Sequence, residues 1–151
     1  MRLFDATTTF VTNLPARTHI FASIDANGDH PDLGPCHQTR TTPNGASLLH
    51  LCTTAGLYAI NAHQICVIGH QFPQAENWQG HTWWGATDDS GAARNDYLLT
   101  RLSARADTAP VTLDFAIGHH LKVGGQARII DHIPLSCLTL YNLECIPTPP
   151  T

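Results

Sequence analysis

The stretch HIFASIDANGDHPDLGP, residues 19–35, changes sharply from an apolar run to polar residues and turn formers. Residues 19–25 are rich in β-forming side chains, so we expect a buried strand there. Asp25, Asn27 and Gly28 follow at its end, where a turn is expected. An acid and an amide at a strand end suit chemistry, but Asp25-x-Asn27 is also a common pattern of Asx turns and helix caps. The motif alone is compatible with both interpretations.

Composition limits the possible classes of protein. The chain has 151 residues, of which 42% are hydrophobic, and this suits one domain with a substantial core. The formal net charge of −4 gives no overall field that would attract nucleic acid. Five cysteines without a C-x-x-C pair favour reduced thiols in an intracellular protein. We find no secretory signal pattern and no apolar run long enough to span a bilayer, so no membrane association is expected.

Hydrophobic periodicity predicts alternating helices and strands, which together indicate a mixed α/β fold without repeats. We expect helices at 2–12 and 46–56, and strands at 19–25, 57–61, 81–86, 95–101, 111–118 and 134–143. The turn-prone segment 87–94 is expected to join the strands on either side of it into a hairpin. Residues 1–145 are read as one domain, and residues 146–151 as a proline-rich tail.

Acids occur beside apolar runs at three predicted strand ends or turns. These are Asp25 with Asn27, Asp96, and Asp131 with His132. A buried lone carboxylate is unfavourable, so such acids usually have a cation, a metal or several donors as partners. If the fold brings these residues together, they form a site for a divalent metal and a phosphate. Taken singly, two of them have a structural alternative: a turn or cap for Asp25-x-Asn27, and a hairpin surface for Asp96. Asp131 with His132 is more suggestive of function, because a turn end before a strand rarely needs both groups for structure.

Four ordered motifs resemble the carboxyl-terminal half of the endonuclease/exonuclease/phosphatase superfamily, specifically the apurinic-type endonuclease domains of LINE-type retrotransposons. The similarity extends over about residues 18–140. The G-D-x-N motif is matched at residues 24–27, with Ile24 in place of glycine. A helix-and-strand motif is matched by Asn44, Gly45, Leu48, Cys52, Leu57 and Asn61, and a T-W pair by Thr82 and Trp83. The R-x-D-Y motif is matched at 94–97, and S-D-H-x-P at 130–134 without its serine.

The resemblance implies a metal-dependent phosphodiesterase that cuts DNA with Mg²⁺ or Mn²⁺. It assigns Asp25 to orient or deprotonate the attacking water and Asn27 to hold that water or a phosphate oxygen. It assigns Asp131 to the metal, His132 to the phosphoryl oxygens and Asp96 to orienting His132. Arg94 is expected to bind substrate or to pair with a neighbouring acid. These roles fit the chemistry of phosphodiester hydrolysis, which needs an in-line water and neutralisation of developing charge.

The same resemblance implies a four-layer α/β/β/α sandwich with its amino-terminal half missing. In that family an earlier strand carries the main Glu metal ligand, whereas the only acid before Asp25 here is Asp5, in a predicted helix. We therefore expect the chain alone to be weakly active or inactive. A reverse transcriptase domain in a longer natural chain and a nuclear location are further expectations of the retroelement type.

Two other classes of function compete with the nuclease. A catalytically inactive remnant, or a binding module with the same fold, is favoured by the missing Glu ligand. A histidine-rich metal protein is suggested by the ten histidines. Their spacing argues against it, because no H-x₃-H pair on a predicted helix and no Cys/His cluster occurs.

Overall fold

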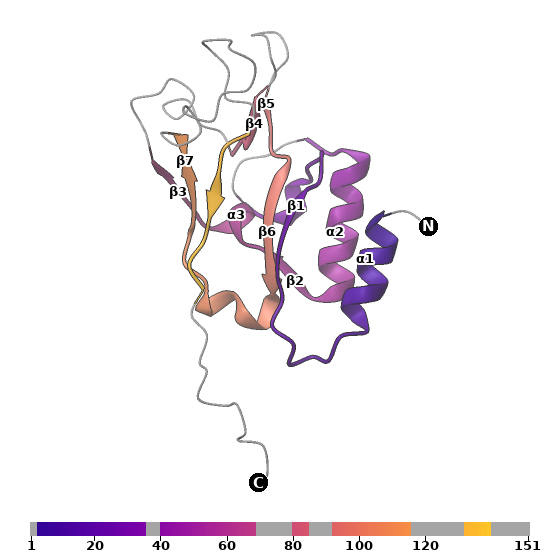
Figure 1. Ribbon diagram of the computed structural model, residues 1–151. Helices are drawn as coiled ribbons and strands as arrows, with labels where there is room; N and C mark the ends of the chain where they lie inside the picture. Colours follow the sequence, from indigo (N-terminus) through magenta and orange to yellow (C-terminus); the bar gives the residue numbers. More distant parts are fainter. Residues whose placement is uncertain (1–2, 36–39, 69–79, 85–91, 116–131, 140–151) are drawn as a thin grey trace.

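A computed structural model describes residues 3–35, 40–68, 80–84, 92–115 and 132–139 (Figure 1). Its helices are α1 (Leu3–Thr12), α2 (Pro43–Ala55) and α3 (Ile60–His63), with 3₁₀ turns η1 (Pro31–Leu33) and η3 (Leu102–Asp107). Its strands are β1 (Phe21–Asp25), β2 (Leu57–Ala59), β3 (Ile65–Ile68), β4 (Trp83–Trp84), β5 (Ala92–Ala93), β6 (Asp96–Arg101), β7 (Val111–Asp114) and β8 (Leu135–Ser136). The mixed α/β class predicted from the sequence is confirmed.

The first sheet has the strand order β1-β6-β2, with β6 antiparallel to both neighbours. Strand β6 is central because Tyr97, Leu98 and Leu99 are all buried, so both of its faces are covered. Helices α1 and α2 lie side by side next to this sheet (Figure 1), and one apolar cluster joins them to it. This sheet carries most of the candidate site.

Helix α2 begins earlier than the sequence predicted, at Pro43 rather than near residue 46. The Thr42 side chain accepts a hydrogen bond from the Gly45 backbone N–H at 3.0 Å, and Pro43 occupies the first turn, where its missing N–H is harmless. The predicted end at Gly56 is confirmed, because this glycine adopts the left-handed conformation with φ 61°. The helix therefore has a polar cap at one end and a glycine cap at the other.

The second sheet has the order β3-β7-β8, with β3 parallel to β7. Strand β3 was not predicted, and the expected strand 57–61 is shorter because the chain turns into α3 at Ile60. A cluster that includes Tyr58, Leu98 and Val111 connects the two sheets. The described residues thus show helices packed on one sheet and a second sheet joined to the first by apolar contacts. They do not establish a four-layer sandwich.

The predicted hairpin between residues 81–86 and 95–101 is wrong. Strand β4 pairs instead with β5, with Trp83 opposite Ala93, while β6 pairs with β1 and β2. Alternating and apolar residues in β6 suggested a strand correctly, but they did not specify its partners. A strand buried on both faces belongs in the middle of a sheet, and this requirement outweighs local hairpin pairing.

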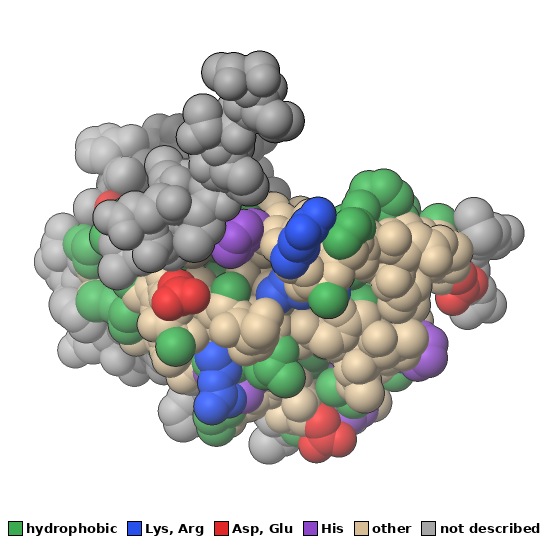
Figure 2. Space-filling model, turned by 90° about the horizontal axis from the view of Figure 1, so that it is seen from below, with side chains coloured by type: hydrophobic (Ala, Val, Ile, Leu, Met, Phe, Trp, Pro, Cys, Tyr) green, Lys and Arg blue, Asp and Glu red, His purple; other side chains and the backbone are tan. Residues whose placement is uncertain are grey.

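The surface agrees with the low charge content of the sequence. On the face shown in Figure 2, the described Arg side chains form no continuous stripe. None of the described helices has both the length and the apolar character required to cross a bilayer.

Candidate metal centre

Asp25 and Asp96 are directly opposite each other at one end of the first sheet. Asp25 is the last residue of β1 and Asp96 the first of β6, and the antiparallel register pairs them. Side chains at paired positions project from the same face, about 5 Å apart at Cβ. Two carboxylates so placed repel each other unless a cation, a proton or donor groups lie between them. The pairing of β1 with β6 thus creates a local concentration of negative charge.

His132 completes this group from a distant part of the chain. Its Nδ1 lies 2.9 Å from Asp96 Oδ2, so the predicted hydrogen bond between these side chains is confirmed. An isolated bridge pairs the backbone of His132 with Trp83, which places the imidazole next to the start of β6. The His132 side chain is 40% exposed and that of Asp96 21% exposed, so both are accessible to a ligand.

Burial controls the ionisation of Asp96. Desolvation raises the pKa of this carboxyl above its ordinary value, and the charge of Asp25 acts in the same direction. Hydrogen bonds from His132 and Thr82 act in the opposite direction, but they do not outweigh desolvation. A nearby cation would relieve the unfavourable charge on Asp96.

Thr82 holds the start of β6 in place. Its buried hydroxyl oxygen accepts hydrogen bonds from the backbone N–H groups of Asn95 and Asp96, each at 3.0 Å. Its carbonyl oxygen accepts a hydrogen bond from the Ile133 N–H at 2.9 Å, next to His132. One residue therefore orients both Asp96 and the segment that carries His132. The sequence pattern pointed to Thr82 only as half of a T-W pair, without a role.

Asn61 also holds the start of β6 in place, through two hydrogen bonds of its side chain. Its side-chain amide donates to the Asp96 carbonyl at 2.9 Å and accepts from the Leu98 N–H at 3.0 Å. Asn61 is 1% exposed, so these bonds satisfy polar atoms that water cannot reach. The sequence pattern pointed to Asn61 only as the last residue of the helix-and-strand motif, without a role.

Asn27 lies in the turn that follows β1. Its backbone N–H donates to Asp25 Oδ1 at 3.0 Å, which is the Asx turn expected from the sequence. Asn27 has φ 46°, a conformation that asparagine tolerates better than most residues. Its side chain is exposed. The structural role of the motif is therefore established, and the assignment of its amide to substrate stays a prediction.

A buried polar network fixes the residues just beyond Asn27. The Tyr97 hydroxyl donates to Asp29 Oδ1 at 2.7 Å and contacts the Gly28 carbonyl oxygen at 3.2 Å. The Asp29 N–H donates to the Thr42 hydroxyl oxygen at 3.0 Å, and the Asp29 carbonyl oxygen accepts from the Thr42 N–H at the same distance. Asp29 is only 2% exposed. Sequence reasoning did not identify Asp29 or Tyr97 as parts of this support.

Arg94 faces this network. Its Nε lies 4.0 Å from Asp29 Oδ1, and the residue is 1% exposed. The structure thus gives Arg94 an acidic neighbour, which was one of the two expected roles, although the acid is Asp29 rather than Asp96. Contact of Arg94 with substrate stays a prediction. Asp131, expected to bind the metal, lies outside the described residues.

The three side chains could together hold a metal ion. One ligand atom from each of Asp25, Asp96 and His132 lies within 4.8 Å of the others. Carboxylate oxygens are the preferred ligands of Mg²⁺, and the addition of an imidazole suits Mn²⁺ as well. The donor set and the raised pKa of Asp96 both fit a divalent cation.

Comparisons with known proteins support the fold. The structure resembles a 3'-5' exonuclease (NExo) from Neisseria meningitidis with a TM-score of 0.59 and 17% sequence identity. The match covers 91% of this chain and 52% of the exonuclease, so the chain spans about half the length of that protein. No protein-family model and no curated protein matches the sequence. The fold of this chain is therefore similar to that of about half of this exonuclease.

Proposed function

We propose that this chain carries the metal centre of a divalent-metal-dependent phosphodiesterase that hydrolyses DNA. One observation carries the proposal: Asp25, Asp96 and His132 come together at a sheet end, within a fold similar to that of an exonuclease. The ordered sequence motifs add support, because they include all three residues.

The chemistry requires an aligned water and stabilisation of negative charge on the phosphoryl group. A divalent cation bound here would neutralise part of that charge and lower the pKa of a water molecule. In our proposal the exposed Asp25 carboxylate orients the water and accepts its proton, and the exposed Asn27 amide donates to a phosphate oxygen. Because Nδ1 of His132 contacts Asp96, we assign the protonated Nε2 to a phosphoryl oxygen and leave the carboxylates of Asp25 and Asp96 to hold the cation.

The finer assignments follow from the motifs. We propose an endonuclease of the LINE-type retroelement class, with Mg²⁺ or Mn²⁺ as cofactor, Asp131 as a further metal ligand and Arg94 as a contact to substrate. A reverse transcriptase domain as partner and a nuclear location belong to the same proposal. Since the chain spans about half of the matched exonuclease, we also propose that its own turnover is slow.

A pair of measurements on the 151-residue chain tests the proposal. Electron paramagnetic resonance of free Mn²⁺ measures metal binding, and nicking of supercoiled plasmid with millimolar Mn²⁺ measures activity. We expect Mn²⁺ binding that Asp25→Ala and Asp96→Asn each weaken at least tenfold, because each removes a charged ligand of a site with few ligands. Weak nicking should disappear in the same variants.

Asp107→Asn is the matched control, since Asp107 is an exposed acid on η3. It should leave both readouts unchanged. Mn²⁺ binding that is insensitive to Asp25→Ala would overturn the metal centre. Site-specific Mn²⁺ binding with DNA binding but no nicking would favour the alternative of a binding module or inactive remnant, which the partial coverage of the exonuclease also allows.

A further inference from the structure

A second site lies away from the metal centre, in a pocket of about 330 Å³. The pocket is formed by η1, the end of α2, β2 with α3, and η3, and it shares no lining residue with the Asp25, Asp96 and His132 group. Its volume is within the range of small-molecule sites. This pocket has no role in the proposed metal centre.

The floor of the pocket is apolar and buried. Leu33, Cys52, Leu57 and Ala59 contribute side chains that are each no more than 7% exposed. Burial raises the pKa of the Cys52 thiol to about 12, so it acts as an apolar wall and not as a nucleophile. A ligand that occupies this floor must have an apolar body.

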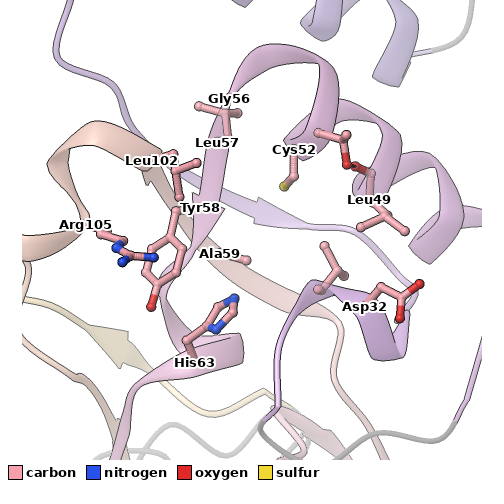
Figure 3. A pocket seen from close by; sticks show the side chains of 12 residues that line it. Asp32, Leu49, Cys52, Gly56, Leu57, Tyr58, Ala59, His63, Leu102 and Arg105 are labelled. Carbon is pink, nitrogen blue, oxygen red and sulfur yellow. Dashed lines mark hydrogen bonds between the residues drawn. The ribbon is translucent and has the colours of Figure 1, made fainter.

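One side of the pocket is polar and aromatic. Figure 3 shows Arg105, Tyr58 and His63 on one side and Asp32 with Leu49 on the other. The Tyr58 and His63 rings are stacked, with centroids 4.6 Å apart and planes inclined by 22°. The exposed His63 ring, backed by the buried Tyr58 ring, offers a flat surface to a planar ligand.

Arg105 supplies the positive charge of this side. Within the described part of the chain, no carboxylate lies at ion-pair distance from its exposed guanidinium. Burial lowers the pKa of His63, and the charge of Arg105 adds to this effect, so the imidazole is neutral near pH 7. A single cation beside an apolar floor matches a ligand with one negative charge.

We propose that this pocket binds a small aromatic carboxylate, with the carboxylate on Arg105 and the ring against Tyr58, His63 and the apolar floor. A planar guanidinium pairs well with a planar carboxylate through two parallel hydrogen bonds. Asp32, on the opposite side, disfavours a second negative charge at the far end of the ligand. The site is therefore suited to monoanions rather than to nucleic acid.

Titration of the full chain with benzoate, followed by heteronuclear NMR, tests this site. We expect saturable shifts of the signals of Leu33, Ala59 and His63, and weaker binding of benzyl alcohol, which has the ring without the charge. Arg105→Gln should weaken benzoate binding about five- to tenfold, as expected for loss of a charge-assisted hydrogen bond in an open pocket. Arg17→Gln, at another exposed arginine, should leave it unchanged.

Three outcomes would overturn the proposal: no saturable shifts, equal binding of benzoate and benzyl alcohol, or benzoate binding that Arg105→Gln leaves unchanged. Tighter binding of phenyl phosphate than of benzoate would overturn the assignment to a carboxylate. Leu102→Ala provides a second check, because Leu102 is 50% exposed on the pocket wall and its removal should weaken benzoate about two- to threefold without unfolding the chain. None of these readouts depends on nuclease activity or on a metal.

Discussion

Asp25 and Asp96 face each other as register partners on β1 and β6, and the pKa of Asp96 is raised by burial and by the charge of Asp25. Asp96 is therefore placed where folding alone does not favour its charge. Positions that are unfavourable for the metal-free fold are common at functional sites, because the ligand supplies the missing partner.

Replacing Asp96 by Asn should leave the stability of the metal-free protein unchanged or raise it at pH 7. A carboxyl with a raised folded-state pKa holds its proton more tightly in the folded state, so its contribution to the free energy of unfolding falls as pH rises through its titration. Asparagine removes the charge and keeps the shape. Thermal denaturation in EDTA checks this expectation, and a melting temperature several degrees below wild type would contradict it.

Mn²⁺ should stabilise the protein more at pH 7.5 than at pH 5. The metal needs deprotonated carboxylates, and the raised pKa of Asp96 makes proton competition stronger as pH falls. At tenfold excess over Kd the expected gain is about 1.4 kcal/mol, which corresponds to roughly 3–6 °C for a chain of this size. Differential scanning fluorimetry at the two pH values measures it.

Asp25→Asn should abolish most of that Mn²⁺-dependent shift, whereas Asp107→Asn should retain it. An equal shift in wild type and Asp25→Asn would mean that Mn²⁺ binds elsewhere in the chain.

Thr82→Val should destabilise the protein by about 2 kcal/mol. The substitution keeps the volume but removes the oxygen that accepts from two backbone N–H groups, of Asn95 and Asp96, at a position that is 0% exposed. Urea denaturation measures the loss. Thr82→Ser keeps the hydroxyl and should recover most of the stability; if both variants lose the same amount, the missing methyl and not the hydroxyl is responsible.

The sequence predicted the elements that depend on local signals. Helix α2 ends where Gly56 can adopt a left-handed conformation, and the Asx turn at Asp25 and Asn27 follows from the side-chain chemistry of these residues. The contact of His132 with Asp96 could be expected only through the resemblance to a family, since 35 residues separate the two in the sequence.

The hydrogen bonds that hold the site residues in place could not be predicted from local sequence signals. Thr82 and Asn61 act on backbone groups, and Asp29 accepts from the Tyr97 hydroxyl. These contacts join segments that are distant in sequence and leave no periodic pattern. The partners of β6 were missed for a related reason. Residue types show that a strand is buried, but pairing depends on the packing of the whole sheet.

The last prediction concerns Tyr97 and Asp29, which should be strongly coupled. Tyr97→Phe removes the hydroxyl that donates to Asp29 Oδ1 at 2.7 Å, and Asp29 is 2% exposed, so water cannot readily replace the lost donor. We expect a loss of about 2 kcal/mol, and a larger loss for Asp29→Ala, which deprives the Tyr97 hydroxyl and the His30 N–H of an acceptor and also removes the carboxylate beside the buried Arg94. The double variant should lose clearly less than the sum of the two, by at least about 1 kcal/mol, because both changes break one interaction. Urea denaturation of all four proteins completes the cycle. Additive losses would show that the hydrogen bond contributes nothing of its own to stability.

Mn²⁺ binding measured on the same proteins adds a second result. Because Gly28 and Asp29 directly follow Asn27, loosening them should also loosen the turn that begins at Asp25. The affinity for Mn²⁺ should therefore fall in the order of the stability losses.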